Sequence, residues 1–97
     1  MAHIDEYLLQ ILEKKGSDLH FLAGDPPRIR QFGELQPLRP EPLAREFVQT
    51  ALYEIMPRAA TARFEEREGA DFAYTMGEYG RFRVNVMRHL NGMGAVF

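Results

Sequence analysis

The arginines near the end of the chain are the residues whose type and spacing most clearly predict chemistry. Arg81 and Arg83 stand two positions apart, and they alternate with the apolar residues Phe82 and Val84. A period of two is typical of a half-buried strand, so both guanidinium groups should leave the same face, about 7 Å apart. Guanidinium forks on a rigid strand suit bidentate capture of a phosphate or a carboxylate.

The same arginines also have a purely structural interpretation. No acidic residue occurs between Gly80 and Phe97, where Arg88 adds a further positive charge, so the charge of this segment is unbalanced locally. The arginines could instead pair with Asp71 or Glu78 across a hairpin. Spacing alone leaves both interpretations open.

Other catalytic chemistry has weaker support. The sequence contains no Gly-Lys-Ser/Thr, which a nucleotide-hydrolysing phosphate loop requires, so the chain by itself is expected to be inactive. The three histidines, His3, His20 and His89, lack metal-ligand spacing, and we expect no metal site. Asp18 and His20 would share one strand face as a carboxylate–imidazole pair, for which a structural hydrogen bond is favoured over catalysis.

A short run of acidic residues follows the middle of the chain. Glu65, Glu66, Glu68 and Asp71 lie within seven positions of one another. Carboxylates at adjacent helix positions diverge around the axis and do not converge on one substrate. The run therefore indicates a solvated helix face, with the basic patch of a partner as the alternative.

Composition limits the class of protein. The 97 residues are enough for one domain, 45% are hydrophobic, and the net charge is −2. This balance disfavours a nucleic-acid partner, which usually requires a basic excess. Zero cysteines exclude a disulfide scaffold and a thiolate metal site. No apolar run reaches the roughly 18 residues needed to insert into a bilayer, so the expected location is the cytoplasm.

Periodicity predicts an α+β domain with an antiparallel sheet and helices packed on it. Helices are expected over residues 4–15, 43–55 and 58–67, and strands over 17–24, 28–32, 34–38, 71–76, 80–90 and 93–97. Pro37 cannot donate to a ladder, which predicts an edge strand there. Asn91-Gly92 predicts a type I′ turn, in which both residues have positive φ. The strand that ends at Phe97 should leave an unfinished, hydrogen-bonding edge.

Several separated motifs, in this order, carry a resemblance to a known family. They are Gly16-Ser17-Asp18-Leu19-His20, Gly24-x-Pro26-Pro27-x-x-Arg30-x-x-Gly33-x-Leu35, Phe64-Glu65, Asp71-Phe72, Gly80-Arg81-Phe82-Arg83-Val84-Asn85 and Gly92-x-Gly94-Ala95-Val96-Phe97. Together they resemble the N-terminal domain of the retraction ATPases of type IV pili, within the secretion ATPases of type II and type IV pilus systems.

The resemblance implies that residues 1–97 form one PAS-like domain that precedes a RecA-like ATPase domain. In such a protein six subunits form a ring, ATP and Mg bind to the ATPase domains, and each N-terminal domain packs on a neighbour. The machine would be cytoplasmic and peripheral to the inner membrane, where a platform protein is its partner, with no membrane insertion and no nucleic acid.

The resemblance also assigns roles to residues. It implies that Arg83, and more weakly Arg81, reach the phosphates of the nucleotide. Further candidates for contacts between domains are Asp18, His20, Arg30 and Arg88. The family usually has another arginine directly after the Val-Phe pair, where this chain ends, and often an aspartate where Phe32 precedes Gly33. Two rival classes stay open: a stand-alone PAS-like sensor, and an interaction module without a nucleotide role.

Overall fold

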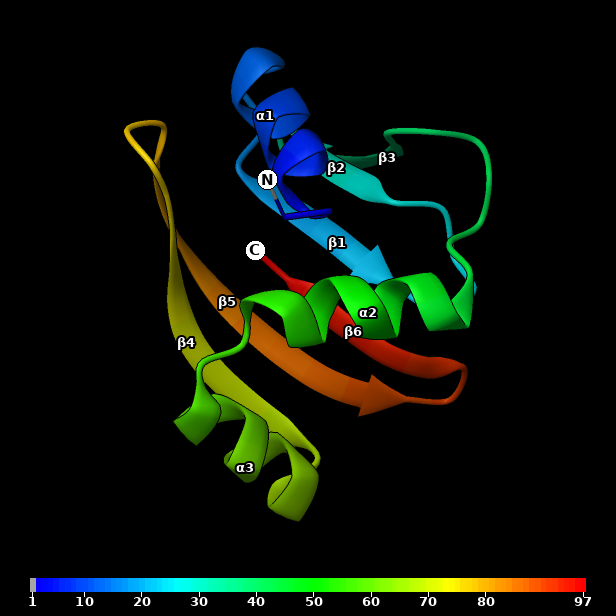
Figure 1. The fold of residues 1–97 in the computed structure, drawn as a ribbon. Helices are drawn as coiled ribbons and strands as arrows, with labels where there is room; N and C mark the ends of the chain where they lie inside the picture. Colours follow the sequence, from blue (N-terminus) through cyan, green and yellow to red (C-terminus); the bar gives the residue numbers. More distant parts are fainter. Residues whose placement is uncertain (1) are drawn as a thin grey trace.

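A computed structural model of the chain describes residues 2–97, which form one six-stranded sheet and three helices (Figure 1). In chain order the elements are α1 (Asp5–Glu13), β1 (Asp18–Leu22), β2 (Arg28–Gln31), β3 (Glu34–Pro37), α2 (Arg45–Ile55), α3 (Arg58–Arg67), β4 (Gly69–Met76), β5 (Gly80–His89) and β6 (Gly92–Val96). Every strand pairing is antiparallel. The predicted α+β class is confirmed.

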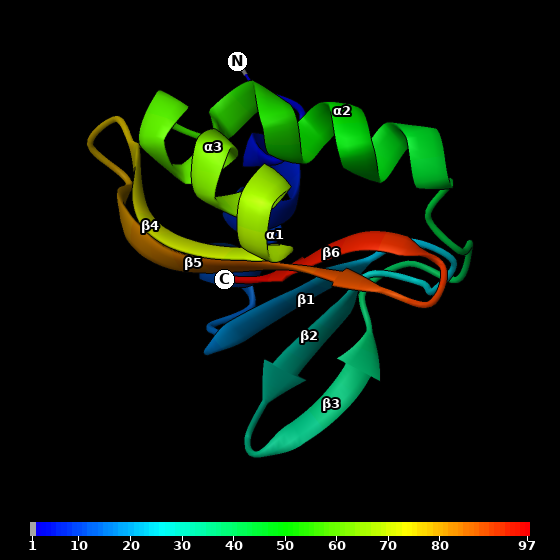
Figure 2. The same cartoon turned by 90° about the horizontal axis from the view of Figure 1, so that it is seen from below.

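The helices all lie on one side of the sheet (Figure 2). Every second side chain of each strand points toward the helices. Phe21 of β1 and Val84 and Val86 of β5 are examples, and all three are fully buried. The helices contribute fully buried Leu8, Leu52 and Phe64 to the same core. Burying each such side chain stabilises the fold by about 1.5–3 kcal/mol. The remaining strand side chains are left on a face that no helix covers.

The strand order is β3-β2-β1-β6-β5-β4. Strand β6 is therefore central, because Val96 is paired with His20 of β1 on one side and with Asn85 of β5 on the other. The expectation of an unfinished edge at the end of the chain is wrong for this reason. The edges are β4 and β3, and the predicted edge position of Pro37 in β3 is confirmed.

The turn between β5 and β6 differs from the prediction by one residue. His89 is paired with Gly92, so Leu90 and Asn91 form the two-residue loop. Neither has positive φ, so the turn is not type I′. Gly92 has a φ of 130° but already lies in the strand, where a Cβ atom would meet the Arg45 side chain at 3.1 Å. The positive φ of Gly92 and the close approach of the Arg45 side chain both favour glycine here, although the residue lies outside the turn.

A turn with two positive φ angles instead joins β2 and β3. Phe32 and Gly33, with φ of 53° and 80°, lie between the paired residues Gln31 and Glu34. The Phe32 side chain is 92% exposed, so packing does not offset its unfavourable backbone conformation. Asparagine and aspartate tolerate this left-handed region better than an aromatic residue does.

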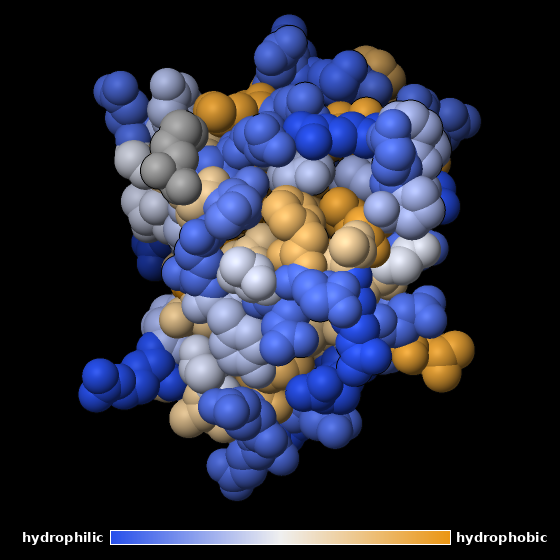
Figure 3. Space-filling model, turned by 45° about the vertical axis from the view of Figure 1, so that its right-hand side comes forward, coloured by the Kyte–Doolittle hydropathy of each residue, from blue (hydrophilic) through white to orange (hydrophobic). Residues whose placement is uncertain are grey.

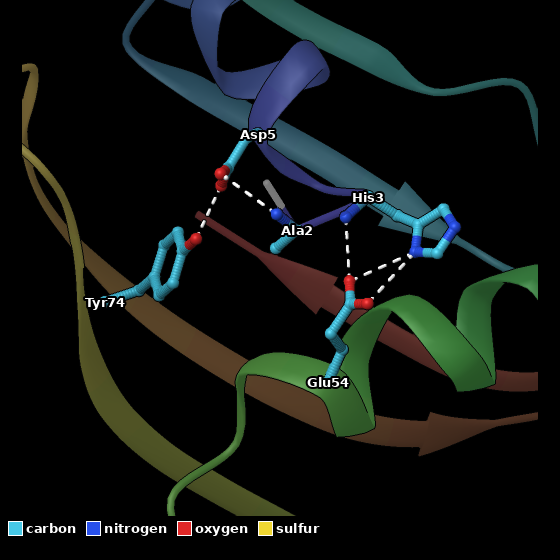
Figure 4. A network of polar contacts seen from close by, with 5 residues as sticks. All are labelled: Ala2, His3, Asp5, Glu54 and Tyr74. Carbon is cyan, nitrogen blue, oxygen red and sulfur yellow. Dashed lines mark hydrogen bonds and ion pairs between the residues drawn. The ribbon is translucent and has the colours of Figure 1, made fainter.

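The start of α1 is tied to distant elements by polar contacts (Figure 4). The buried carboxylate of Asp5 accepts hydrogen bonds from the Tyr74 hydroxyl of β4 and from the backbone N–H of Ala2. The backbone N–H of His3 donates to Glu54 of α2 at 2.7 Å, and its imidazole lies 3.1 Å from the same carboxylate. The hydrogen bond from the His3 backbone lowers the pKa of Glu54.

Burial, together with the hydrogen bond to Asp5, raises the pKa of the Tyr74 phenol to about 12. Replacing Tyr74 with phenylalanine should lower the free energy of unfolding by about 1–3 kcal/mol, because one oxygen of a buried carboxylate loses its donor. Urea denaturation measures this change. The matched control is Tyr79→Phe, since Tyr79 is 58% exposed and should give no measurable change. Equal effects of the two substitutions would show that the Asp5 contact does not stabilise the fold.

Replacing Phe32 with asparagine should stabilise the protein by about 1 kcal/mol, because asparagine adopts a positive φ at lower cost. For a domain of this size the melting temperature should rise by about 4–8 °C. The control is Phe32→Ala, which removes the exposed ring but not the backbone strain. If both variants melt at the same temperature, backbone strain at position 32 is not what limits stability.

Candidate functional site

The uncovered face of the sheet is the candidate site, and we call it the open face. Alternation and register place the following side chains on it: Asp18 and His20 of β1, Arg28 and Arg30 of β2, Asp71, Ala73 and Thr75 of β4, and Arg81, Arg83 and Asn85 of β5. Five of the six residues singled out from the sequence are among them. The sheet thus assembles on one surface residues that are up to 67 positions apart in the chain (18 to 85).

The arginine pair on β5 is exposed. Arg81 lies opposite Thr75 and Arg83 opposite Ala73, so neither faces an acidic residue across the ladder. Within residues 2–97, no carboxylate lies within 4 Å of either guanidinium. The structural alternative, pairing with Asp71 or Glu78, is therefore not formed.

Asp71 has a different partner. The side-chain amide of Asn85 donates to its carboxylate at 2.9 Å, and the two residues lie directly opposite each other in the ladder. This contact engages the one acidic side chain of β4, and Arg83 stands two positions from Asn85 on the same face. The guanidinium group of Arg83 thus remains available for an anion from outside the domain.

The second part of the open face is the β1–β2 corner. Arg30 lies opposite Asp18 in the register, and its Nε is 3.2 Å from the Asp18 carboxylate. The expected pairing of Asp18 with His20 is thus replaced by an ion pair across the strands. Burial is the main cause that lowers the pKa of His20, and the charges of Arg30 and Arg28 lower it further while Asp18 opposes them.

A shallow hollow of about 240 Å³ connects the two parts. It lies where β6 ends between β1 and β5, and its walls include Asp18, Arg83 and Asn85. Val96 and Phe97 form the end of β6 in the same hollow. The open face carries four arginines and two aspartates, an excess of two positive charges, whereas the whole chain has a net charge of −2. The open face therefore suits an anionic ligand or an acidic surface.

Arg88 does not belong to this surface. It lies five positions from Arg83, an odd number, and so points to the helix-covered side. There its Nε is 3.7 Å from the Glu68 carboxylate, and its guanidinium lies 5.1 Å from the ring centroid of Phe64. This odd separation could have been read from the sequence. Of the acidic run, Glu68 has this internal partner and Asp71 is bonded to Asn85.

The helix-covered side has hollows of a different character. An apolar area ringed by hydrophilic side chains is visible there in Figure 3. Hollows of about 280 and 290 Å³ border Phe47, one lined also by Tyr7 and Arg39 and the other by Leu9 and Glu6. Arg39 is stacked 4.3 Å from the Tyr7 ring centroid, and burial raises the pKa of the Tyr7 phenol. None of the six residues singled out from the sequence lines these hollows.

No group of three or more metal-ligating side chains is found among residues 2–97. In the same range, no helix has both the length and the apolar character needed to cross a membrane.

Comparison with known sequences gives related proteins, although no protein-family model matches. The chain is 40% identical over 91 residues to the type IV pilus retraction ATPase PilT of Pseudomonas aeruginosa, an alignment covering 93% of this chain and 26% of PilT. It is 34% identical over 92 residues to the type IV pilus ATPase PilU of the same bacterium, covering 94% of this chain and 24% of PilU. The chain thus spans about a quarter of the length of these relatives.

Solved structures agree. The pilus retraction motor PilT, crystallised with bound ADP, superposes with a TM-score of 0.88 at 28% identity, over 99% of this chain and 28% of that one. The ATPase DotB of Legionella pneumophila superposes with a TM-score of 0.82 over 96% of this chain and 27% of its own, and at 20% identity shows the fold alone.

The fold and the sequence likeness therefore define an N-terminal domain of a secretion ATPase. More particularly, the chain is an N-terminal PilT-like domain. The resemblance inferred from the motifs is confirmed at this level.

The pKa of His20 should depend on its two charged neighbours in opposite directions. Arg30→Gln should raise it and Asp18→Asn should lower it, which ¹H–¹³C NMR titration of the imidazole measures. Shifts of the same sign in both variants would contradict this electrostatic account.

The lowered pKa of His20 also predicts how stability depends on pH. Since burial holds the folded-state pKa below the ordinary value of about 6.5, protonation of His20 disfavours the folded state. This destabilisation is absent well above pH 6.5, and the free energy of unfolding should fall as pH decreases through and below that value.

Proposed function

We propose that this chain is the regulatory and assembly domain of a hexameric type IV pilus retraction ATPase, the motor of twitching motility. Its open face packs on the ATPase domain of a neighbouring subunit and presents arginines to the nucleotide phosphates. The observation that carries the proposal is the pair Arg81 and Arg83, which are exposed on the uncovered sheet face and form no ion pair within residues 2–97. A rigid strand holding unpaired guanidinium groups is suited to an anion supplied by another domain.

In this arrangement Arg83 acts as an electrostatic stabiliser, with Arg81 as a weaker second contact. Phosphoryl transfer spreads negative charge over the γ-phosphate oxygens, and a guanidinium placed against them lowers the barrier. The ATP, the Mg and the phosphate-binding loop belong to the ATPase domain of the whole protein. Closure of the N-terminal domain on that domain would couple the nucleotide state to the shape of the ring.

The β1–β2 corner supplies the rest of the docking surface. The Asp18–Arg30 ion pair and His20 lie on the same face as the arginines, and they would contact protein surface around the nucleotide rather than the nucleotide itself. The assembled motor would be cytoplasmic and peripheral to the inner membrane, where it acts on the platform protein of the pilus. PilT and PilU, named as pilus ATPases, support this assignment at 40% and 34% identity.

In the whole protein, Arg83→Gln should reduce ATP turnover by a factor of about 10³ or more, the range reported for arginine fingers, and leave the ring assembled. Steady-state hydrolysis and native mass spectrometry measure the two effects. The control is Arg67→Gln, since Arg67 is exposed on α3 on the other side of the sheet. Undiminished turnover in Arg83→Gln would refute the phosphate role and favour a docking module without one.

A further inference from the structure

The free edge of β4 is a feature that the proposed function does not use. The sheet has two edges, β3 and β4, and their sequences differ in how far they discourage pairing. Strand β3 is four residues long and contains Pro37, two features that discourage pairing with another chain. Strand β4 has eight residues without proline or lysine, and its one charged residue, Asp71, is already bonded to Asn85.

The phase of the ladder shows which backbone groups face outward. The N–H of Arg88 donates to the carbonyl of Glu68 at 3.1 Å, so this pair is hydrogen-bonded. Alternate pairs of an antiparallel ladder are hydrogen-bonded, which makes Phe72 and Tyr74 the residues bonded to β5. The N–H and C=O groups of Asp71, Ala73 and Thr75 therefore point away from the sheet.

This edge is complementary to itself. A second copy in antiparallel orientation, related by a two-fold axis at Ala73, would pair residues from Ala70 to Met76. Asp71 would lie opposite the Thr75 hydroxyl of the second copy, and Phe72 opposite Tyr74 of the second copy. Both rings are half-buried in the isolated chain, and cross-strand aromatic pairs stabilise sheets. About six backbone hydrogen bonds would form. An axis at Asp71 would instead oppose two carboxylates.

Helix α3 packs beside the β4 edge (Figure 1). A hollow of about 200 Å³ lies beside the edge, bounded by Ala59, Ala60 and Arg63 of α3 and by Asp71 and Phe72 of β4. The helix therefore lies along the first half of β4, near residues 69–72. The two-fold axis places the helix of the second copy beside the opposite half, so the two helices are offset along the strands.

We propose that a second copy of this chain pairs with it along β4, so that the two sheets join into one continuous antiparallel sheet. This association goes beyond the proposed function, because it uses the sheet edge and leaves the open face free. It requires no nucleotide. Failure of the pairing would consequently leave the role of Arg83 unaffected, and the reverse is also true.

Disulfide trapping tests the register of the 97-residue chain directly. The chain has no cysteine, so Ala73→Cys introduces a single thiol that can only cross-link between copies. Hydrogen-bonded partners lie about 5.5 Å apart between Cα atoms, which a disulfide spans. In the control Thr75→Cys the two thiols would lie about 13 Å apart. Oxidation should give mostly dimer for Ala73→Cys and mostly monomer for Thr75→Cys.

Sedimentation equilibrium tests the association without a cross-link. The wild-type chain should dimerise, and Ala73→Pro should weaken the association at least tenfold, because proline removes an outward N–H and spares the bonds to β5. Ala73→Lys would place the lysines of the two copies opposite each other at the axis. It should weaken the association likewise, and it replaces the proline variant if that variant does not fold. A wild-type chain that stays monomeric at millimolar concentration overturns the proposal. So does a dimer that persists in both variants, or equal cross-linking at positions 73 and 75.

Discussion

Each strand of this sheet commits one side chain in two to the core beneath the helices, and the chemistry of the open face follows from that constraint. Phe82, Val84 and Val86 contact the helix-covered side, so the intervening Arg81, Arg83 and Asn85 have no alternative but the open face. A shift of one residue in register would exchange the two sets and expose the core. The hydrophobic effect therefore fixes the direction of the arginines more firmly than any contact they make themselves.

The two polar pairs on the open face, Asp71–Asn85 and Asp18–Arg30, leave Arg83 without an acidic partner in the domain. Asp71 is engaged by Asn85 and Asp18 by Arg30, while Arg83 stands between them at the end of β6. Both aspartates of the open face thus already have a partner within the domain. An arginine held in this way retains its affinity for an external anion, which explains how a domain with a net negative charge can still present a positive surface.

The secondary structure and the faces of the strands could be predicted from the sequence, because they depend on the local spacing of apolar residues. The helices follow from an apolar period of about 3.6 residues, and the strands and the shared face of Arg81 and Arg83 follow from a period of two. The opposite direction of Arg88 could be predicted from the same period of two. The order of the sheet could not be predicted, since β1 and β6 are paired through residues 76 positions apart, His20 and Val96. The Asp18–Arg30 pair likewise depends on cross-strand register. The position of the β5–β6 turn also could not be predicted, because the positive φ of Gly92 lies in the strand and the loop is formed by Leu90 and Asn91.

We propose that the open face meets an ATPase domain through its arginines. The most direct measurement is an NMR titration of the labelled chain with the separately produced ATPase domain of the same protein, with and without a non-hydrolysable ATP analogue. We predict that the side-chain Nε–H signals of Arg81 and Arg83 and the amides of β1, β2 and β5 shift, and that the analogue strengthens binding. Shifts confined to α1 and α2, or binding that does not depend on nucleotide, would contradict the account.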